Sequence, residues 1–470
     1  MMSPSEPLHY LSIDEAGSLI KAGNLSPVDL TESYLERIHN LNPVLNSFIT
    51  VNGDSATAQA KAMEQEITRG SYRGPLHGIP IALKDLIDTA GIATTYGCKA
   101  FRDRTPDTDA TVAARLQAAG CIVLGKLTMS ELAMVGPPGF GEETRNPWNT
   151  DHAPGGSSSG SGTAVAAGLC AGSIGSDTGG SIRFPASNNN IVGLMPTYGR
   201  VSRRGVMPLS WTLDHLGPMT RTIEDAALML SAISGFDPGD RTTSSEAIPD
   251  FRANLTSEVK GLKVGVLENT FEDNHPDTRS AIEQAIRVFE AMGARVRPVR
   301  IPNYDVLHIA NSIIYLAEAF NNFGTLLREQ PQDIGKVFRI YGYMGGLFTA
   351  DEYIQAMRLR SCTRVELRKI FEQVDLILSP TTNAPPKRID EFDPFILTQP
   401  TRSATAEVFN LAACPALSVP CGFSGDGLPI GLQLAAKPMN EQTLLNAAYA
   451  YQETTELHRQ HPPIQATQAG

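Results

Sequence analysis

A run of glycine and serine at residues 155–162 (GGSSSGSG) constrains this chain more than any other stretch. It leads through an alanine-rich segment, residues 163–170, to a second small-residue loop at residues 177–181 (DTGGS). Glycine lets the backbone approach another group closely, and serine supplies a hydroxyl that can attack or relay a proton. A flexible linker has no reason to lead into an apolar, helix-like segment. We therefore predict two loops that hold serines and direct backbone N–H groups to one point.

Two other kinds of site use similar residues. A phosphate-binding P-loop needs a lysine directly after its last glycine, and no lysine follows these glycines at that spacing. Residues 156–160 match the Gly-x-Ser-x-Gly pattern of a nucleophile elbow. However, no apolar strand precedes them, and no acid and histidine partners stand out downstream. The remaining interpretation is a serine nucleophile that is activated by a group other than histidine.

Residues 155–186 resemble the signature of the amidase signature family, which is Gly-Gly-Ser-Ser, an alanine-rich helix and Asp-x-Gly-Gly-Ser-Ile-Arg-x-Pro. The resemblance extends upstream to residues 78–85 (GIPIALKD). It extends downstream through residues 196–202 (PTYGRVS) and 415–420 (PALSVP), so it covers most of the chain. It implies an α/β fold in a single domain, with a large mixed β-sheet covered by helices on both faces. It also implies an amidase, a hydrolase of linear amide C–N bonds.

The nucleophile is expected to be Ser181, because it follows Thr178, Gly179 and Gly180, whose backbone N–H groups can form an oxyanion hole. None of the nine histidines presents itself as the base. Lys84 is the better candidate, because it follows an apolar run that would bury it, and burial lowers the pKa of a lysine. The resemblance places the family's lysine at this position.

By the same resemblance, Ser157 occupies the position of the family's bridging serine, which is held on a cis peptide bond. Its hydroxyl would pass a proton from Ser181 to neutral Lys84 and then return it to the departing nitrogen. This implies a Ser-Ser-Lys triad that works through an acyl-enzyme.

Three further residues are expected to support this site. We expect Ser158 to buttress the proton relay, Asp177 to order the loop by accepting backbone N–H bonds, and Arg183 to anchor it. The chain departs from the family's usual pattern at residues 188–190, which read NNN, and at Met195, where a lysine is usual. We expect these departures to alter local packing and pocket shape, and the chemistry to be unchanged.

The amino-acid composition limits the kinds of molecule that the protein is expected to bind. The formal net charge of −11 makes nucleic acid and anionic membrane poor direct partners. The six cysteines are scattered and form no metal-binding or redox pattern, so we expect no metal, no cofactor and a cytoplasmic protein with reduced thiols. No secretory signal and no apolar run of about 18 residues occur. We therefore expect a small-molecule amide or carbamate as the partner, and a homodimer is left open.

The chain order predicts one domain with successive parts. We expect a helical layer at about residues 12–70, a catalytic core at about 71–236, a peripheral excursion at about 240–373 and a C-terminal return to the core at about 374–463. Pro43 is expected to end the helix that begins at Pro27. Trp148 is expected to be a core residue, and no role is assigned to His152.

The leading functional interpretation is a stand-alone amidase or carbamate-type hydrolase. The alternative within the family is the glutamine-hydrolysing A subunit of a tRNA-dependent amidotransferase. Its members are expected to carry an acid seven residues before the asparagine of an Asn-Leu-Ala segment. Here that position is Ser403, with Glu407 as a nearby substitute. A non-catalytic binding protein is the third hypothesis. A small apolar or aromatic substrate is expected because six apolar or aromatic residues are expected around the pocket, namely Met134, Phe140, Trp211, Tyr341, Tyr343 and Phe348.

Overall fold

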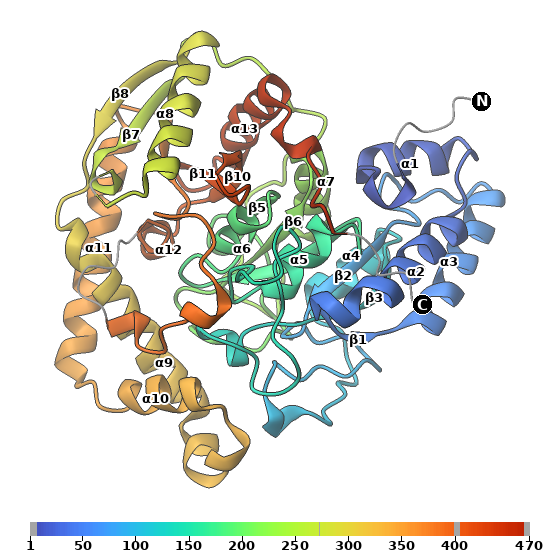
Figure 1. The fold of residues 1–470 in the computed structure, drawn as a ribbon, viewed down its shortest axis with the longest axis horizontal. Coiled ribbons are helices and arrows are strands. Elements are labelled where there is room, and N and C mark those ends of the chain that lie inside the picture. Colours follow the sequence, from blue (N-terminus) through green and yellow to red (C-terminus); the bar gives the residue numbers. More distant parts are fainter. Residues whose placement is uncertain (1–6, 272, 399–404, 465–470) are drawn as a thin grey trace.

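The computed structural model describes residues 7–271, 273–398 and 405–464. Within them, eleven strands form one mixed sheet in the order β1-β3-β2-β4-β6-β5-β10-β11-β9-β7-β8. Helices pack around this sheet (Figure 1), and the fold is α/β, as predicted. The strands are β1 (Phe48–Val51), β2 (Pro80–Lys84), β3 (Ile122–Leu127), β4 (Gly172–Asp177), β5 (Val192–Met195), β6 (His215–Thr220), β7 (Lys263–Leu267), β8 (Arg295–Val299), β9 (Leu376–Pro380), β10 (Ala416–Phe423) and β11 (Pro429–Ala436).

The α-helices of the described residues alternate with these strands over much of the chain. They are α1 (Ile13–Lys21), α2 (Pro27–Leu45), α3 (Gly53–Thr68), α4 (Thr111–Ala118), α5 (Ser159–Ala166), α6 (Arg183–Asn188), α7 (Ile223–Ile233), α8 (Pro276–Ala291), α9 (Leu307–Glu329), α10 (Lys336–Gly345), α11 (Ala350–Phe371), α12 (Glu407–Ala412) and α13 (Glu441–Thr455). None of the described helices combines the length and apolarity that a membrane crossing needs.

The helix that begins at Pro27 is longer than predicted. Its start follows the expected signals, because the Ser26 side chain accepts the backbone N–H of Val28 and proline occupies the first helical position. Pro43 does not end it, and α2 continues to Leu45. The expectation was wrong because a proline in the last turn disturbs few hydrogen bonds. The helix ends where the next residue adopts a φ of 52°.

The sheet is parallel in two places. β2 lies between β3 and β4 and is parallel to both, and β7 is parallel to both β8 and β9. The strands between these two parts are antiparallel to their neighbours. β10 and β11 come from the end of the chain but lie between β5 and β9, so the C-terminal part joins the first half of the sheet to the excursion. In Figure 1 the helices α1 to α3 lie at one side of the molecule and α9 to α11 at the other.

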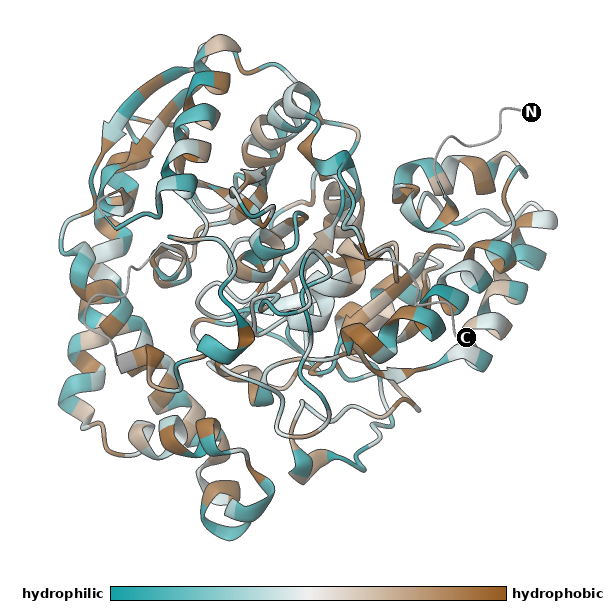
Figure 2. Ribbon diagram, viewed as in Figure 1, coloured by the Kyte–Doolittle hydropathy of each residue, from teal (hydrophilic) through white to brown (hydrophobic). Residues whose placement is uncertain are grey.

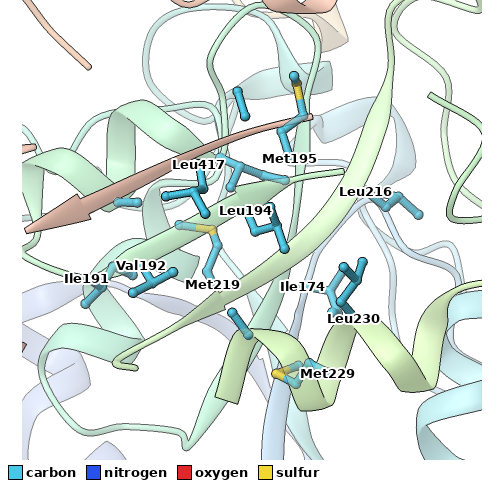
Figure 3. Close-up of a cluster of buried hydrophobic side chains, with 14 of the residues drawn as sticks. Ile174, Ile191, Val192, Leu194, Met195, Leu216, Met219, Met229, Leu230 and Leu417 are labelled. Carbon is cyan, nitrogen blue, oxygen red and sulfur yellow. The ribbon is translucent and has the colours of Figure 1, made fainter. Parts of the chain in front are cut away.

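The core beneath the central strands is apolar and closely packed. Figure 3 shows Ile174 on β4 among Leu194, Met219, Leu230 and Leu417, all of which are fully buried. Burying a side chain of this size stabilises the fold by about 1.5–3 kcal/mol. The outer helices mix hydrophobic and hydrophilic residues (Figure 2). Because β4 is embedded in this core, the loop that follows it has a fixed base.

Candidate active site

The predicted base and the predicted nucleophile loop meet at the ends of two neighbouring strands. Lys84 is the last residue of β2, and β4 is parallel to β2 and ends at Asp177. The carboxyl ends of parallel strands lie at the same edge of a sheet, which is where α/β folds place their sites. Ser181 follows β4 within a few residues. The topology therefore brings Lys84 and the Ser181 loop to one edge.

The amine of Lys84 is fully buried and surrounded by serine hydroxyls. Its Nζ lies 2.7 Å from Ser157 Oγ, 2.9 Å from Ser158 Oγ and 2.8 Å from Ser176 Oγ. A neutral amine has two N–H donors and one lone pair, so it can donate two of these bonds and accept the third. Ser157 and Ser158 were predicted to lie here, but Ser176 was not. It lies on β4, in the strand that leads to the nucleophile loop.

Burial lowers the pKa of Lys84 to about 7, and the carboxylates of Asp177 and Asp214 oppose this shift. A large fraction of the lysine is therefore neutral near neutral pH. A neutral amine can accept a proton, whereas an ammonium cannot. The environment of Lys84 thus suits a general base.

Two loops hold the predicted serines together. The peptide bond between Gly156 and Ser157 is cis, as the resemblance predicted. The N–H of Ser158 donates to the carbonyl of Ser181 at 3.2 Å, and the N–H of Ser130 donates to the carbonyl of Ser157 at 3.1 Å. Ser181 is half-buried, and the described residues contain no hydrogen bond between its hydroxyl and that of Ser157. Catalytic hydrogen bonds are often long in free enzymes and shorten when substrate binds.

A buried ion pair fixes the base of the nucleophile loop. The carboxylate of Asp177 accepts hydrogen bonds from Arg183 Nη2 at 3.0 Å, Gly180 N at 2.7 Å and Asn410 Nδ2 at 2.9 Å. Arg183 also donates to Gln433 Oε1 at 2.7 Å and to Asn410 Oδ1 at 2.6 Å. Burial disfavours the charged carboxylate, but Arg183 and the hydrogen bonds hold the pKa of Asp177 well below its usual range. Asp177 and Arg183 thus make the contacts expected of groups that order and anchor the loop.

The N–H groups that were expected to bind an oxyanion are not equivalent. The Gly180 N–H donates to Asp177, so it already has a partner. The N–H groups of Thr178 and Gly179 have no partner among the loop hydrogen bonds of the described residues. The Thr178 hydroxyl donates to Asp214 Oδ1 at 2.6 Å, and burial raises the pKa of Asp214 to about 6. Asp214 was not predicted from the sequence.

Two side chains crowd the loop at Gly179. A Cβ atom at this position would lie 3.1 Å from Asn311 Oδ1 and 3.3 Å from Glu407 Cγ. Asn311 comes from α9 and Glu407 from α12, and both side chains are buried. A side chain at this position would therefore have to displace Asn311 or Glu407 by a few tenths of an ångström. Ser403, the other residue considered for glutamine recognition, lies outside the described residues.

The asparagines at residues 188–190 support the loop before the cis peptide bond. Asn189 Nδ2 donates to the carbonyls of Pro154 and Pro185, both at 2.7 Å. The carbonyl of Asn189 accepts Nε1 of Trp148 at 3.0 Å, so this half-buried tryptophan packs against the same segment. The departure from the family pattern thus acts on local packing.

Trp211, one of the six predicted pocket residues, lines a hollow to which the other five do not contribute. Trp211 is 58% exposed and lines a hollow with Tyr198. Tyr343 is 43% exposed, and its hydroxyl donates to the carbonyl of Leu327 on α9. Met134 is buried in the segment whose Ser130 is hydrogen-bonded to Ser157. Within the described residues no group of His, Cys, Asp and Glu side chains could hold a metal ion.

Comparison with known proteins agrees with this geometry. Residues 29–445 match the model of the family described as Amidase. The chain is 39% identical to the A subunit of a glutamyl-tRNA(Gln) amidotransferase from Geobacter metallireducens, over 97% of this chain and 100% of that protein. The structure is similar to that of the native peptide amidase from Stenotrophomonas maltophilia, with 32% identity, a TM-score of 0.87 and coverage of 98% of this chain and 100% of that one.

A bacterial aryl acylamidase of the amidase signature family is also similar in structure. Its TM-score is 0.88 at 27% identity, with coverage of 97% of this chain and 98% of that one. These similarities extend over nearly the whole length of each protein. The chain therefore belongs to the amidase signature family and is an amide-cleaving hydrolase.

Proposed function

We propose that this chain hydrolyses the amide or carbamate-type bond of a small, apolar or aromatic substrate through a triad of Lys84, Ser157 and Ser181. The observation that carries the proposal is the buried Lys84 amine, whose pKa is lowered to about 7 by burial and whose Nζ lies 2.7 Å from Ser157 Oγ. An amide is stabilised by resonance, so its cleavage needs a strong nucleophile, a stabilised oxyanion and a proton for the leaving amine.

The first half of the reaction forms an ester on the enzyme. Ser181 Oγ attacks the carbonyl carbon while its proton passes to Ser157 Oγ, and the Ser157 proton passes to Lys84 Nζ. The oxyanion of the tetrahedral intermediate receives hydrogen bonds from the N–H groups of Thr178 and Gly179. The C–N bond then breaks, and the proton returns through Ser157 to the leaving nitrogen. The products are an acyl-enzyme and a free amine.

The second half repeats these steps with water. Water attacks the ester carbonyl and gives one proton through Ser157 to Lys84. When the bond to Ser181 Oγ breaks, that oxygen takes the proton back. The acid product leaves, and the triad returns to its starting protonation. The cycle leaves no net proton on the triad, because every proton taken by Lys84 is returned.

The segment beside the cis peptide bond supports an apolar substrate. Ser130 at its start is hydrogen-bonded to Ser157, and Met134 is buried within it. Further along, a Cβ atom at Gly136 would lie 3.1 Å from the ring of Phe392 and 3.4 Å from Val337. Phe392 is 39% exposed, so an apolar surface continues from this segment toward solvent.

A second candidate function is glutamine hydrolysis within a tRNA-dependent amidotransferase. It is favoured by the curated relatives that are named as A subunits of glutamyl-tRNA(Gln) amidotransferases, which are 36–39% identical over nearly their whole length. The buried carboxylate of Glu407 beside Gly179 is the described group that could face an α-ammonium group. The two candidates share the triad and differ in the substrate.

One assay separates the two functions. The purified chain is given a hydrophobic anilide and glutamine in parallel, and release of aniline and ammonia is measured. We expect turnover of the anilide and poor cleavage of glutamine. Ser181→Ala serves as the control, because it removes the nucleophile and exposes any contaminating activity. Efficient glutamine cleavage that depends on partner subunits, with no turnover of simple amides, would instead establish the second function.

A further inference from the structure

Three arginines form a stripe along α11, apart from the triad. Arg360, Arg364 and Arg368 follow one another at intervals of four residues, which places them on one face of the helix. The β11–α13 connection, with Lys437, forms the opposite wall. The α11 groove, as we call the space between them, consists of two adjoining hollows that share Arg364 and Pro438 and have volumes of about 410 and 350 Å³. Volumes of this size suit a small organic molecule.

Two cations of the α11 groove have no acidic partner in the described ranges of the chain. Neither Arg364 nor Lys437 has a side-chain hydrogen bond or ion pair within the part of the chain that the structure describes. Lys369, on another face of the same helix, does pair with Glu366 at 2.8 Å. Among the described residues that line the groove, the one carboxylate is Glu372, which lies in the second hollow. This concentration of cations is unusual in a chain with a net charge of −11.

Arg360 forms the inner part of the positive wall. It is partly buried and donates to the carbonyls of Leu411 and Thr212 at 3.2 and 3.1 Å. These acceptors are neutral, and the carboxylate of Glu318 offsets the charge of Arg360 only in part. Burial and the nearby charge of Arg364 lower the pKa of Arg360. A bound anion would relieve both effects, because it would face two guanidinium groups at once.

An aromatic platform completes the first hollow. Trp211 is 58% exposed and lies in this hollow with Tyr198. The guanidinium of Arg203 lies 4.8 Å from the Trp211 ring and 4.6 Å from the Tyr198 ring, and it donates to the carbonyl of Trp211 at 2.6 Å. Trp211 is thus held in place although it is exposed. An exposed, fixed indole is a surface on which a planar ring can stack.

We propose that the α11 groove binds a small organic anion in which a planar ring is joined to a phosphate or carboxylate group. The ring stacks on Trp211, and the anionic group lies between Arg364 and Arg360 with Lys437 opposite. None of the residues that line the groove belongs to the triad, so the site is additional to the catalytic one. An adjacent second anionic group would lie toward Arg368.

Phenyl phosphate is the probe, and calorimetry and tryptophan fluorescence are the measurements. The chain has two tryptophans, so the fluorescence change should disappear in Trp211→Phe, while the other tryptophan, Trp148, still reports folding. We expect saturable binding of phenyl phosphate, weaker binding of inorganic phosphate and no binding of benzyl alcohol. Arg364→Gln should weaken the binding of phenyl phosphate by about ten- to a hundredfold, because it removes a charged hydrogen-bond donor.

The matched control is Arg358→Gln. Arg358 is exposed on the same helix but does not line the groove, so its removal changes the net charge equally and should leave binding unchanged. Thermal unfolding shows that both variants are folded. The proposal is overturned if phenyl phosphate does not saturate, or if Arg364→Gln and Arg358→Gln bind it equally. It is also overturned if only RNA binds, and does so through Arg364, because the groove would then recognise a phosphate backbone.

Discussion

Lys84 Nζ and Ser176 Oγ lie 2.8 Å apart, so the amine at the end of β2 is hydrogen-bonded to the neighbouring parallel strand as well as to the loop that carries Ser157. The Ser176 hydroxyl accepts a hydrogen bond from the ammonium form of Lys84 more favourably than from the neutral form. It therefore acts on the charge of the base and also holds it in position.

Ser176→Ala should lower kcat/KM by about tenfold, because one hydrogen bond to a charged group is lost. Losing an acceptor destabilises the ammonium form, so the pKa of Lys84 should fall further and the acid limb of the pH–rate profile should move to lower pH. The matched control is Ser173→Ala, which removes another buried hydroxyl of β4 that has no hydrogen-bond partner among the described residues. A purely structural role for Ser176 would reduce the rate without moving the acid limb.

The pH dependence of the wild-type enzyme follows from the lowered pKa of Lys84, about 7. The neutral amine is the active form, so kcat/KM should rise about tenfold per pH unit below pH 7 and become level above it. In Lys84→Ala the remaining rate should be far lower, and it should not show this rise below pH 7. Initial rates with a neutral anilide, measured from about pH 5 to 9, provide the check. A wild-type rate that falls across this range would contradict a neutral lysine base.

Ser181 should carry the acyl group during turnover. A fluorophosphonate should react once per active chain, and peptide mapping should find the adduct on Ser181. Ser181→Ala should not react and should lose at least about a thousandfold in kcat, the scale seen when a nucleophile is removed. Ser161→Ala is a suitable control, because Ser161 is buried in helix α5 and the variant keeps Ser181. This variant should remain active and should still be labelled on Ser181. An adduct on another serine of an inhibited sample would remove Ser181 from this role.

The residues proposed for the triad could be selected from the sequence because each lies within a short, contiguous motif. The nucleophile loop is contiguous from Asp177 to Ser181, and Lys84 follows an apolar run that forms β2, as expected. β4 was not expected as a strand, because residues 172–177 (GSIGSD) contain one large apolar side chain and owe their strand conformation to pairing with β2 and β6. Ser176 was missed for the same reason.

Contacts between distant parts of the chain could not be predicted from the sequence. Asn410 and Gln433 reach Arg183 from α12 and β11 only because the C-terminal strands insert into the middle of the sheet. Asp214 directly precedes β6, and its contact with Thr178 depends on the pairing of β6 with β4, which sets His215 opposite Asp177. The α11 groove likewise requires α11 to lie beside the connection between β11 and α13.

The last prediction concerns the buried pair of Asp177 and Arg183, both of which are fully inaccessible to solvent. Arg183→Met should reduce the free energy of unfolding by about 3–5 kcal/mol, because it leaves the Asp177 carboxylate buried without its counter-ion. Urea unfolding gives this value from the shift of the midpoint at a constant slope.

An exposed ion pair serves as the control for this loss of stability. Arg300 and Glu268 lie 2.8 Å apart with both side chains largely exposed, so Arg300→Met should cost at most about 1 kcal/mol. Adding Asp177→Asn to Arg183→Met should recover part of the loss, because the uncompensated charge is then removed. The loss in Arg183→Met should also be smaller at low pH, where protonation can neutralise Asp177, whose pKa rises once the guanidinium is gone. If Arg183→Met and Arg300→Met were equally stable, the anchoring role of Arg183 would be refuted.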